Sequence, residues 1–387
     1  MSFEFLTPVS EEVLSHCQNL NEQTLGNTIV KHTAADGFPE LQNVQIALIG
    51  IRENRNSIHT AVAPDFDAVR KTFYELFPGN WNFSIADLGD IKAGNDVKDT
   101  YFVIQEIVCI LLKQQCIPIL LGGSQDLAYA QYRAYDNFDQ MVNLVNVDSR
   151  FDLGDASEIL NNRSFVGKIV IDKPYNLFNY SNLGYQTYFN AQEEIDLMDK
   201  LFFDAYRLGE IAEDISITEP VLRDADMVCI DLEAINGSYL SYNEVNSPNG
   251  LDGKEICAIA RYAGISDKVT SFGIYEYKNA IQQGLSEKLI SQIIWYFAEG
   301  VNYRSQELVV REQQGVLHYT VPIEDEILSF YKSSKTQRRW IEIPFISGID
   351  NKLKRHTLLP CTYKDYENAC NQQIPERWYK ARRKNEV

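Results

Sequence analysis

The feature that most constrains the fold is a regular alternation of two residue patterns between residues 44 and 300. Short runs of β-branched and other apolar residues alternate with longer segments in which apolar residues recur at helical spacing. The expected strands cover residues 44–50, 82–89, 117–123, 142–148, 179–189, 226–233 and 268–276, and the expected helices cover 65–76, 97–115, a segment from Gln125, 192–205, 254–264 and 286–299. The alternation predicts a three-layer, doubly wound α/β domain with a mostly parallel sheet.

Three parts are predicted along the chain. Residues 1–43 form an N-terminal segment, residues 44–304 form the α/β domain, and residues 305–387 form a C-terminal extension that is polar, aromatic and interrupted by proline. Within the extension, residues 332–387 hold 13 Lys and Arg against 6 Asp and Glu, whereas the rest of the chain holds 23 against 48. An acidic body therefore carries a basic tail.

Composition excludes several classes of protein. The 387 residues are 45% hydrophobic and 12% aromatic, which is typical of a folded globular protein. The sequence shows no run long enough to span a membrane and no secretory signal, so a soluble, cytoplasmic protein is expected. The seven cysteines are scattered without a C-x-x-C pair, and we expect reduced thiols. A net charge of −18 argues against nucleic-acid binding by the body, because phosphates would be repelled.

Polar clusters end three of the expected strands: LLGGSQD (120–126), NVDSRFDLG (146–154) and VCIDLEAING (228–237). The carboxyl ends of parallel strands meet at one edge of a sheet, where ligands bind in this class of fold. Asp148 and Asp152 have a spacing suited to carboxylates that gather a cation. Other sites are disfavoured, since no Lys follows the short glycine run for a phosphate loop, and Ser124 with Asp126 lacks a base.

In order and spacing these clusters resemble the signatures of the arginase, agmatinase and formimidoylglutamase family, which read Gly-Gly-Asp-His, Asp-Ala-His-x-Asp and Ser-x-Asp-x-Asp-x-x-Asp-Pro. The segment FGIYEYKN (272–279) is similar to a later Leu-Asp-x-x-Glu-x-Asn-Pro stretch of that family. The resemblance covers roughly residues 44 to 300. It implies the arginase fold and a site with two Mn²⁺ ions, held by two His and four Asp, that activates water for attack on a guanidinium or amidine carbon.

Several positions of the family's site can be carried over to this chain. The resemblance places Gln125 and Arg150 at the two histidine positions, Asp148, Asp152, Asp231 and Glu233 at the four aspartate positions, and Glu276 where the family has an acid that anchors the substrate's cationic group. Three aspartates and the anchoring acid are therefore retained, and both histidines are replaced.

The replacement of both histidines determines which cofactor we expect. A neutral imidazole offers a lone pair to a metal, whereas Gln offers a weak amide oxygen and Arg offers no lone pair. No histidine lies between residues 60 and 317, so His59 or His318 could substitute only through a long-range contact. We therefore expect no cofactor. The alternative is Mn²⁺ or another divalent cation bound through oxygen alone, by the carboxylates of Asp148, Asp152, Asp231 and Glu233.

Arg150 is predicted to replace the metals electrostatically. A guanidinium donates hydrogen bonds in a fork that fits carboxylates, so it can neutralise them without activating water. The simpler alternative is that Arg150 is a solvent-exposed residue at a strand end.

These considerations predict a ureohydrolase-like pseudoenzyme with a structural, binding or regulatory role. One alternative is a metal-dependent amidine or guanidine hydrolase of the formimidoylglutamase type, and another is a sensor of small amidino or amino-acid ligands that uses Glu276. The family's habit of forming trimers and hexamers implies a homo-oligomer. The basic tail interleaves charges with aromatic residues. One alternative is that its rings pack on their own domain while its charges stay in solvent. The other is that it docks on the acidic body of the same or an adjacent subunit, or on an anionic protein partner.

Overall fold

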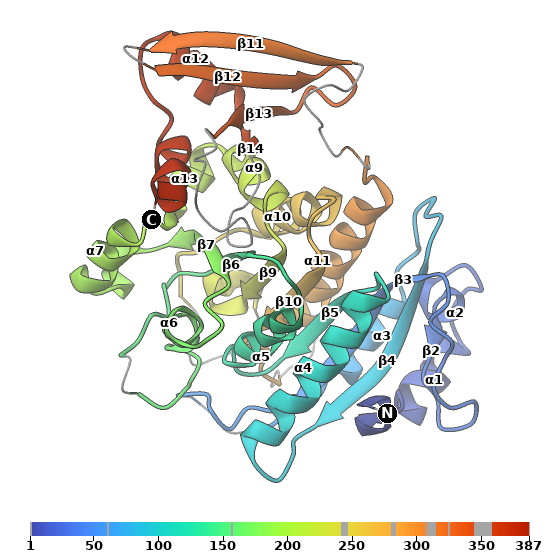
Figure 1. Ribbon diagram of the computed structural model, residues 1–387. Helices are drawn as coiled ribbons and strands as arrows, with labels where there is room; N and C mark the ends of the chain where they lie inside the picture. The colour runs from blue at the N-terminus through green and yellow to red at the C-terminus, as the bar shows by residue number, and fades with distance from the viewer. Residues whose placement is uncertain are drawn as a thin grey trace.

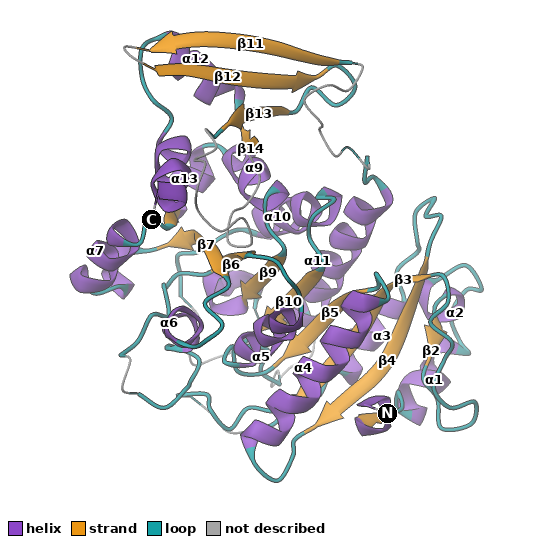
Figure 2. Cartoon of the chain, in the orientation of Figure 1, coloured by secondary structure: helices purple, strands orange, loops and turns teal. Residues whose placement is uncertain are grey.

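A three-layer α/β body carries a smaller antiparallel module in the computed structural model (Figure 1). The structure describes residues 2–59, 62–155, 158–240, 247–279, 284–305, 307, 315–323, 326–343 and 358–386. The predicted fold class is confirmed. The mostly parallel sheet has helices on both faces, and the C-terminal extension forms a separate sheet (Figure 2).

The central sheet contains ten of the described strands, in the order β1-β4-β3-β5-β10-β9-β6-β7-β8, with β2 also paired to β4. They are β1 (Leu6–Thr7), β2 (Val30–Lys31), β3 (Val44–Arg52), β4 (Ser84–Lys92), β5 (Ile117–Gly122), β6 (Val142–Val147), β7 (Leu177–Tyr185), β8 (Asp204–Arg207), β9 (Met227–Asp231) and β10 (Ser271–Tyr275). The pairings are parallel except that of β1 with β4. The late strands β9 and β10 lie between β5 and β6.

Eleven of the described helices belong to the body: α1 (Glu11–Cys17), α2 (Leu25–Thr28), α3 (Asp67–Tyr74), α4 (Val97–Lys113), α5 (Leu127–Arg133), α6 (Phe165–Ile171), α7 (Gln192–Lys200), α8 (Leu208–Glu213), α9 (Thr218–Arg223), α10 (Gly253–Ile265) and α11 (Leu285–Asn302). One apolar core joins the sheet to α1, α3 and α8 to α11. A second core, on the other face, joins it to α4, α5, α6 and α7. Alternate residues of β3 serve the two cores, with Ile46 and Leu48 in the first and Ala47 and Ile49 in the second.

Local sequence signals explain where the longest predicted helix begins. Asp96 caps α4 by accepting a hydrogen bond from the backbone of Lys98 at 2.9 Å, and Asp99 accepts one from the backbone of Asp96 at 2.8 Å. This capping box satisfies backbone donors that the first turn leaves unpaired. Ile104 and Val108 then bury the apolar stripe against the sheet.

The N-terminal segment contributes two short strands to the central sheet. Thr7 pairs with Asp90 and Val30 pairs with Ala86, so β1 and β2 both lie along the outer edge of β4. Each strand is only two residues long, too short for an alternating pattern to be visible in the sequence. The segment covers an edge that would otherwise present unpaired backbone groups.

The C-terminal extension also contains more structure than the sequence indicated. Strands β11 (Val316–Ile323), β12 (Glu326–Ser333), β13 (Arg339–Glu342) and β14 (Leu358–Cys361) form an antiparallel sheet in that order. Helices α12 (Tyr363–Cys370) and α13 (Glu376–Glu386) complete the C-terminal module, which has its own apolar core (Figure 2). Residues 317 to 320 of β11 are all exposed, so the usual alternation of apolar and polar residues is absent there.

The described part of the basic tail packs on its own chain. Lys380 of α13 donates a hydrogen bond to the carbonyl of Phe203 at 3.0 Å, and Lys384 donates one to the side chain of Asn179. Arg377 lies with its Nε 3.9 Å from Asp204 Oδ2. The helix α13 therefore contacts the β7–β8 edge of the acidic body, as one of the two alternatives for the tail predicted. An additional protein partner stays a prediction, as does the homo-oligomer.

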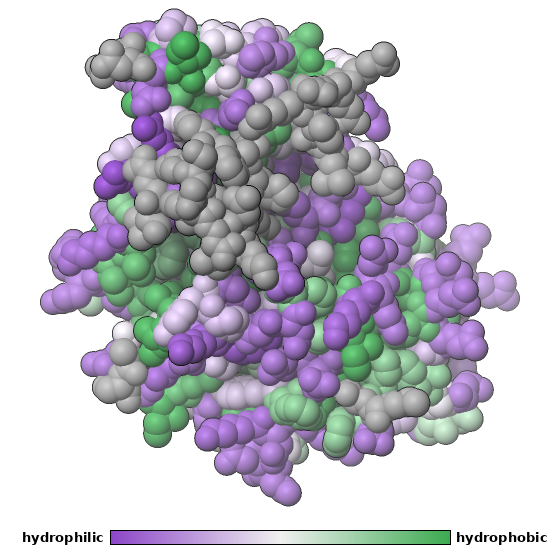
Figure 3. Space-filling view, in the orientation of Figure 1, coloured by the Kyte–Doolittle hydropathy of each residue, from purple (hydrophilic) through white to green (hydrophobic). Residues whose placement is uncertain are grey.

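Hydrophilic side chains cover much of the described surface in Figure 3, and apolar ones gather beside α6 and α7 at the left of that view. Of the helices that the structure describes, none combines the length and the apolar character needed to cross a membrane.

Candidate functional site

Four adjacent strands, β5, β10, β9 and β6, place polar residues together at their carboxyl ends. Gln125 follows β5, Glu276 follows β10, Asp231 ends β9 and Asp148 follows β6. All four side chains are buried, and Asp148, Asp231 and Gln125 have no exposed surface. The insertion of β9 and β10 between β5 and β6 is what brings these segments, distant in the sequence, into one site.

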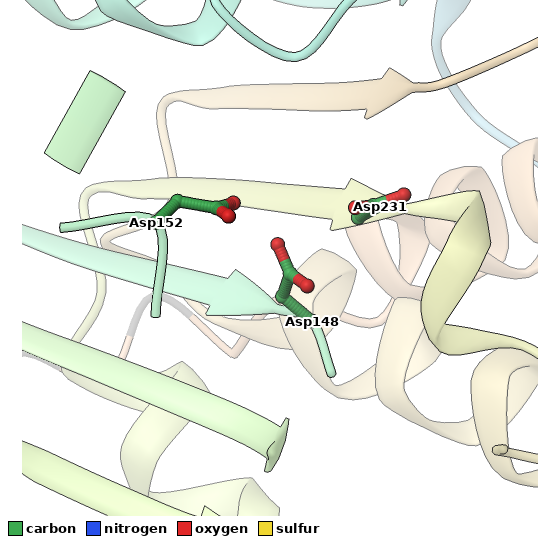
Figure 4. A group of neighbouring side chains, drawn as sticks. All are labelled: Asp148, Asp152 and Asp231. Atoms are coloured by element: carbon green, nitrogen blue, oxygen red, sulfur yellow. The ribbon is translucent and has the colours of Figure 1, made fainter. Parts of the chain in front are cut away.

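Three aspartates form the centre of the site (Figure 4). Asp148, Asp152 and Asp231 each offer a carboxylate oxygen, and these three oxygens lie within 4.8 Å of one another. We call these residues the aspartate triad. Backbone groups fix two of them, since Asp148 Oδ1 accepts a hydrogen bond from the N–H of Arg150 at 2.8 Å and Asp231 Oδ1 accepts one from Glu233 at 2.7 Å. Asp152 reaches the same space from a backbone with φ of 52°.

Burial disfavours the ionised forms of these three carboxyl groups. Burial raises the pKa of Asp152 to about 7, and the nearby guanidinium of Arg163 opposes this rise. Burial and then the charge of Asp152 raise the pKa of Asp148, while burial and then Asp148 raise the pKa of Asp231. A cation bound among the three would favour their charged forms.

Gln125 faces the aspartate triad as a hydrogen-bond donor. The surrounding network assigns its amide nitrogen to the side of the carboxylates, at 3.1 Å from Asp148, 3.1 Å from Asp152 and 3.3 Å from Asp231. Its amide oxygen then faces the amide of Asn146, 3.2 Å from Nδ2 and 2.8 Å from Oδ1. The residue at the family's first histidine position therefore donates hydrogen bonds to the acids and turns its lone pairs away from them.

Arg150 does not occupy the site, and its predicted role as the internal cation is wrong. Its Nη1 donates a hydrogen bond to the carbonyl of Phe189 at 2.7 Å, and its Cζ lies 4.5 Å from the centroid of the Phe189 ring. The backbone turn that lets its N–H cap Asp148 carries the side chain away, toward the short 3₁₀ helix Thr187–Phe189. The guanidinium is half-buried there, so the solvent-exposed alternative does not describe it either.

Arg163 supplies the guanidinium that the sequence assigned to Arg150. Its Nη1 lies 3.7 Å from Asp152 Oδ1 and 3.7 Å from Asp231 Oδ2, and its Nη2 donates a hydrogen bond to Glu233. Burial opposes its charge, but Asp152, then Glu233 and Asp231, outweigh that effect and raise its pKa. Sequence reasoning missed this residue because it precedes α6 in a polar connection, where no periodic pattern indicates which way a side chain points.

Glu233 lies beside the aspartate triad and pairs with several cations. Its Oε1 accepts a hydrogen bond from Lys278 Nζ at 2.6 Å and lies 3.6 Å from His59 Nε2, while Arg163 binds its other oxygen. Burial acts against ionisation of Glu233, but Arg163 and Lys278 overcome it and lower its pKa. His59 therefore does reach this site through a long-range contact, as one alternative predicted. It contacts Glu233 and not the aspartate triad. The other histidine considered, His318, stacks on Tyr331 in the C-terminal module.

Glu276 is buried at the end of β10 and holds two loops together. Its Oε1 accepts hydrogen bonds from the backbone of Gln125 at 2.9 Å and from Asn162 Nδ2 at 3.0 Å, and its Oε2 lies 3.9 Å from Lys278 Nζ. Burial, followed by the charge of Glu233, raises its pKa to about 7. A further cationic group bound beside it would favour the ionised form of this carboxyl group.

Comparison with known proteins identifies the family. A sequence model described as the Arginase family matches residues 44–299. The chain belongs to the arginase family. Its curated relatives include the formimidoylglutamase of Staphylococcus carnosus (strain TM300), which is 24% identical over 246 residues, covering 59% of this chain and 75% of that protein. The formimidoylglutamase of Staphylococcus aureus (strain MSSA476) is 24% identical over 259 residues, covering 64% of this chain and 82% of that protein.

Solved structures show the same fold at lower sequence identity. Formiminoglutamase of Trypanosoma cruzi, solved with two Mn²⁺, matches with a TM-score of 0.63 and 14% identity, over 73% of this chain and 99% of that one. The agmatine ureohydrolase of Thermoplasma volcanium matches with a TM-score of 0.59 and 17% identity, over 76% and 98% of the two chains. These findings confirm the predicted family resemblance and its arginase-like fold.

The prediction that no cofactor is expected is wrong for this member of the arginase family. Its structural neighbour contains Mn²⁺, and the aspartate triad is a group that can hold a metal ion. Three carboxylate oxygens suit a hard divalent cation. Within the triad, Oδ1 of Asp152 is buried and has no hydrogen-bond partner among the described residues, as expected of a ligand atom.

The residues of this site fit one such cation better than a pair of Mn²⁺ ions. Within the part of the chain that the structure describes, no histidine belongs to the candidate metal group. Gln125 presents its amide nitrogen to the carboxylates, and Arg163 stands 3.7 Å from two of them. A guanidinium and an amide N–H group both repel a second cation from that space.

Proposed function

We propose that this arginase-family protein is a divalent-metal-dependent hydrolase that cleaves a C–N bond of a linear amidine, in the manner of formimidoylglutamase. The observation that carries the proposal is the aspartate triad, whose three oxygens lie within 4.8 Å of one another at the ligand-binding edge of the sheet. The match of 24% identity to curated formimidoylglutamases supports the choice of substrate class. The alternative function of the sequence prediction thus has better support than the pseudoenzyme.

The side chains around the triad have separate roles in this proposal. Asp148, Asp152 and Asp231 would hold the cation, and a bound divalent cation would polarise water or the C=N group of the substrate. Gln125 and the backbone N–H groups of Arg150 and Glu233 hold the carboxylates in place by hydrogen bonds.

Glu276 is suited to the charged end of such a substrate. An amidinium group presents N–H donors in a plane, and a carboxylate can accept two of them at once. The Oε1 of Glu276 already binds Gln125 and Asn162, while Oε2 faces Lys278 at 3.9 Å, beyond hydrogen-bond distance. An amidinium that bound Oε2 would therefore lie near the triad without breaking the bonds that position Glu276.

Formamide or urea release tests the proposal. Purified full-length protein would be assayed with formimidoylglutamate, arginine and agmatine, with and without Mn²⁺ or Mg²⁺. We expect metal-dependent release of formamide from formimidoylglutamate, and a loss of about 100-fold or more in Asp231→Asn. Arg261→Ala is the matched control, because this arginine of α10 pairs with Glu299 at 2.9 Å outside the site. Release that persists in Asp231→Asn would contradict the proposal.

A second candidate is a non-catalytic protein that binds a small amidino or amino-acid ligand. It is favoured by the amide nitrogen of Gln125, which faces the carboxylates where the family has a metal-binding imidazole. The same ligands distinguish the candidates in a thermal melt. Stabilisation by a ligand without turnover supports the binding protein, and its loss in Glu276→Gln would locate the site. Absence of both turnover and stabilisation contradicts both candidates.

A further inference from the structure

The position of Arg163 suggests how cation binding to this site is controlled. Its Nη1 stands 3.7 Å from an oxygen of Asp152 and 3.7 Å from an oxygen of Asp231, two of the three carboxylates that can hold a metal. A guanidinium and a divalent cation cannot share that space, because like charges repel strongly in a buried site. Arg163 and a metal therefore compete for the same carboxylates.

The two terminal nitrogens of Arg163 make contacts of different kinds. At 3.7 Å, Nη1 is beyond hydrogen-bond distance of both aspartates, and neither Nη1 nor Asp152 Oδ1 has a hydrogen-bond partner among the described residues. Nη2, in contrast, donates directly to Glu233. The interaction with the triad is thus electrostatic and replaceable, while the interaction with Glu233 anchors the guanidinium outside the triad.

Charge is also distributed unevenly between the two sides of Arg163. On one side, Glu233 is already paired with Lys278 at 2.6 Å and lies 3.6 Å from His59. On the other side, three buried carboxylates face Arg163 and the neutral amide of Gln125. The triad thus has less positive charge beside it than Glu233 has. A divalent cation bound to the triad would supply positive charge there, and Glu233 would still bind the displaced guanidinium of Arg163.

We propose that Arg163 is a built-in competitor of the divalent cation. In the metal-free protein it neutralises part of the charge on Asp152 and Asp231, and metal binding moves its Nη1 away from them while Nη2 stays on Glu233. This arrangement lowers the affinity of the site for metal, so that occupancy follows the concentration of the free cation. The inference rests on the metal site of the proposed function, but it concerns binding and needs no turnover.

Isothermal titration of the full-length protein with Mn²⁺ tests the competition. We expect Arg163→Gln, which removes the charge but keeps a polar side chain, to bind Mn²⁺ about tenfold or more tightly than the wild type. Arg163→Lys keeps the charge and should stay close to the wild type. Arg261→Gln is the matched control, since this arginine of α10 pairs with Glu299 at 2.9 Å outside the site, and its affinity should not change.

A thermal melt gives an independent readout. Without metal, Arg163→Gln should melt at a lower temperature than the wild type, because buried carboxylates lose a cation, and saturating Mn²⁺ should stabilise it by a larger shift. Arg163→Met, an apolar side chain of similar length, should behave in the same way and replaces Arg163→Gln if that variant does not fold.

Two results would overturn the inference in different ways. Equal Mn²⁺ affinity of the wild type and both neutral variants would show that Arg163 does not compete, while the metal site of the proposed function would stand. Absence of Mn²⁺ binding in all variants would remove the metal site, and the inference with it.

Discussion

Asp126 is buried next to the site but points away from the triad. It is 1% exposed, and its Oδ2 accepts a hydrogen bond from the Tyr101 hydroxyl. Burial raises its pKa to about 6, although the hydrogen bond from Tyr101 acts in the opposite direction. An acid whose pKa is raised on folding binds more protons in the folded than in the unfolded state.

This raised pKa predicts a pH dependence of stability with a definite sign. Between pH 3.8, the ordinary value, and about 6, the folded state retains a proton that the unfolded state loses, so the free energy of unfolding falls as pH rises. The fall amounts to roughly 3 kcal/mol. Asp126→Asn should remove this part of the pH dependence, which urea unfolding at pH 4.5, 5.5, 6.5 and 7.5 would measure. Asp199→Asn, at an exposed position of α7, is the control and should leave the slope unchanged.

The residues of the triad could be predicted from sequence, and their partner could not. Asp148 and Asp231 stand at the ends of strands, where periodicity gives both the element and the direction of the chain, so their convergence followed from the order of the strands. Arg150 and Arg163 stand in connections, where the direction of a side chain depends on backbone turns and tertiary contacts. The sequence therefore predicted a guanidinium beside the carboxylates but selected the wrong arginine.

At the scale of single elements, α13 shows how one helix joins two structures. Trp378 is 1% exposed within the core of the C-terminal module, and its Nε1 donates a hydrogen bond to the carbonyl of Glu342 at 2.7 Å. Two lysines of the same helix contact the body, where Lys380 binds the carbonyl of Phe203 and Lys384 binds Asn179. Sequence reasoning predicted that the aromatic residues of the tail must be covered, but the antiparallel strands that cover them were not visible in the sequence.

Paired substitutions in α13 test this division. Trp378→Ala should lower the free energy of unfolding by about 3 to 5 kcal/mol, because it empties a packed position and removes the hydrogen bond from Trp378 to the Glu342 carbonyl. The neighbouring Tyr379 is 49% exposed, and Tyr379→Ala should change the free energy of unfolding by less than about 0.5 kcal/mol. Denaturant unfolding, followed by circular dichroism, measures both. Equal effects of the two substitutions would contradict the packing described here.

At the scale of the whole molecule, Arg223 links the body to the C-terminal module. It ends α9 of the body, and its Nη2 donates hydrogen bonds to the carbonyls of Arg339 at 3.1 Å and Cys361 at 3.4 Å. Its Cζ also lies 4.6 Å from the centroid of the Trp340 ring. Burial lowers the pKa of Arg223 to about 10, so the guanidinium remains charged at neutral pH.

Removal of this link should reduce the cooperativity of unfolding. We expect Arg223→Leu to separate a lower-temperature transition of the C-terminal module from that of the body, because a small module held by fewer contacts unfolds on its own. Scanning calorimetry of the full-length protein measures the number of transitions. Arg261→Leu is the control, since that arginine of α10 pairs with Glu299 at 2.9 Å within the body. A profile unchanged by Arg223→Leu would show that other contacts couple the two parts.

The position of α13 late in the chain has a consequence for synthesis. The ten strands described in the central sheet all precede residue 276, so a growing polypeptide contains the whole sheet before α13 has been translated. During that interval Asp204 and the carbonyl of Phe203 lack the partners that Arg377 and Lys380 later provide. Domains generally fold as units during translation, with earlier parts first. The β7–β8 edge of the nascent protein therefore stays open to a chaperone until α13 has been translated.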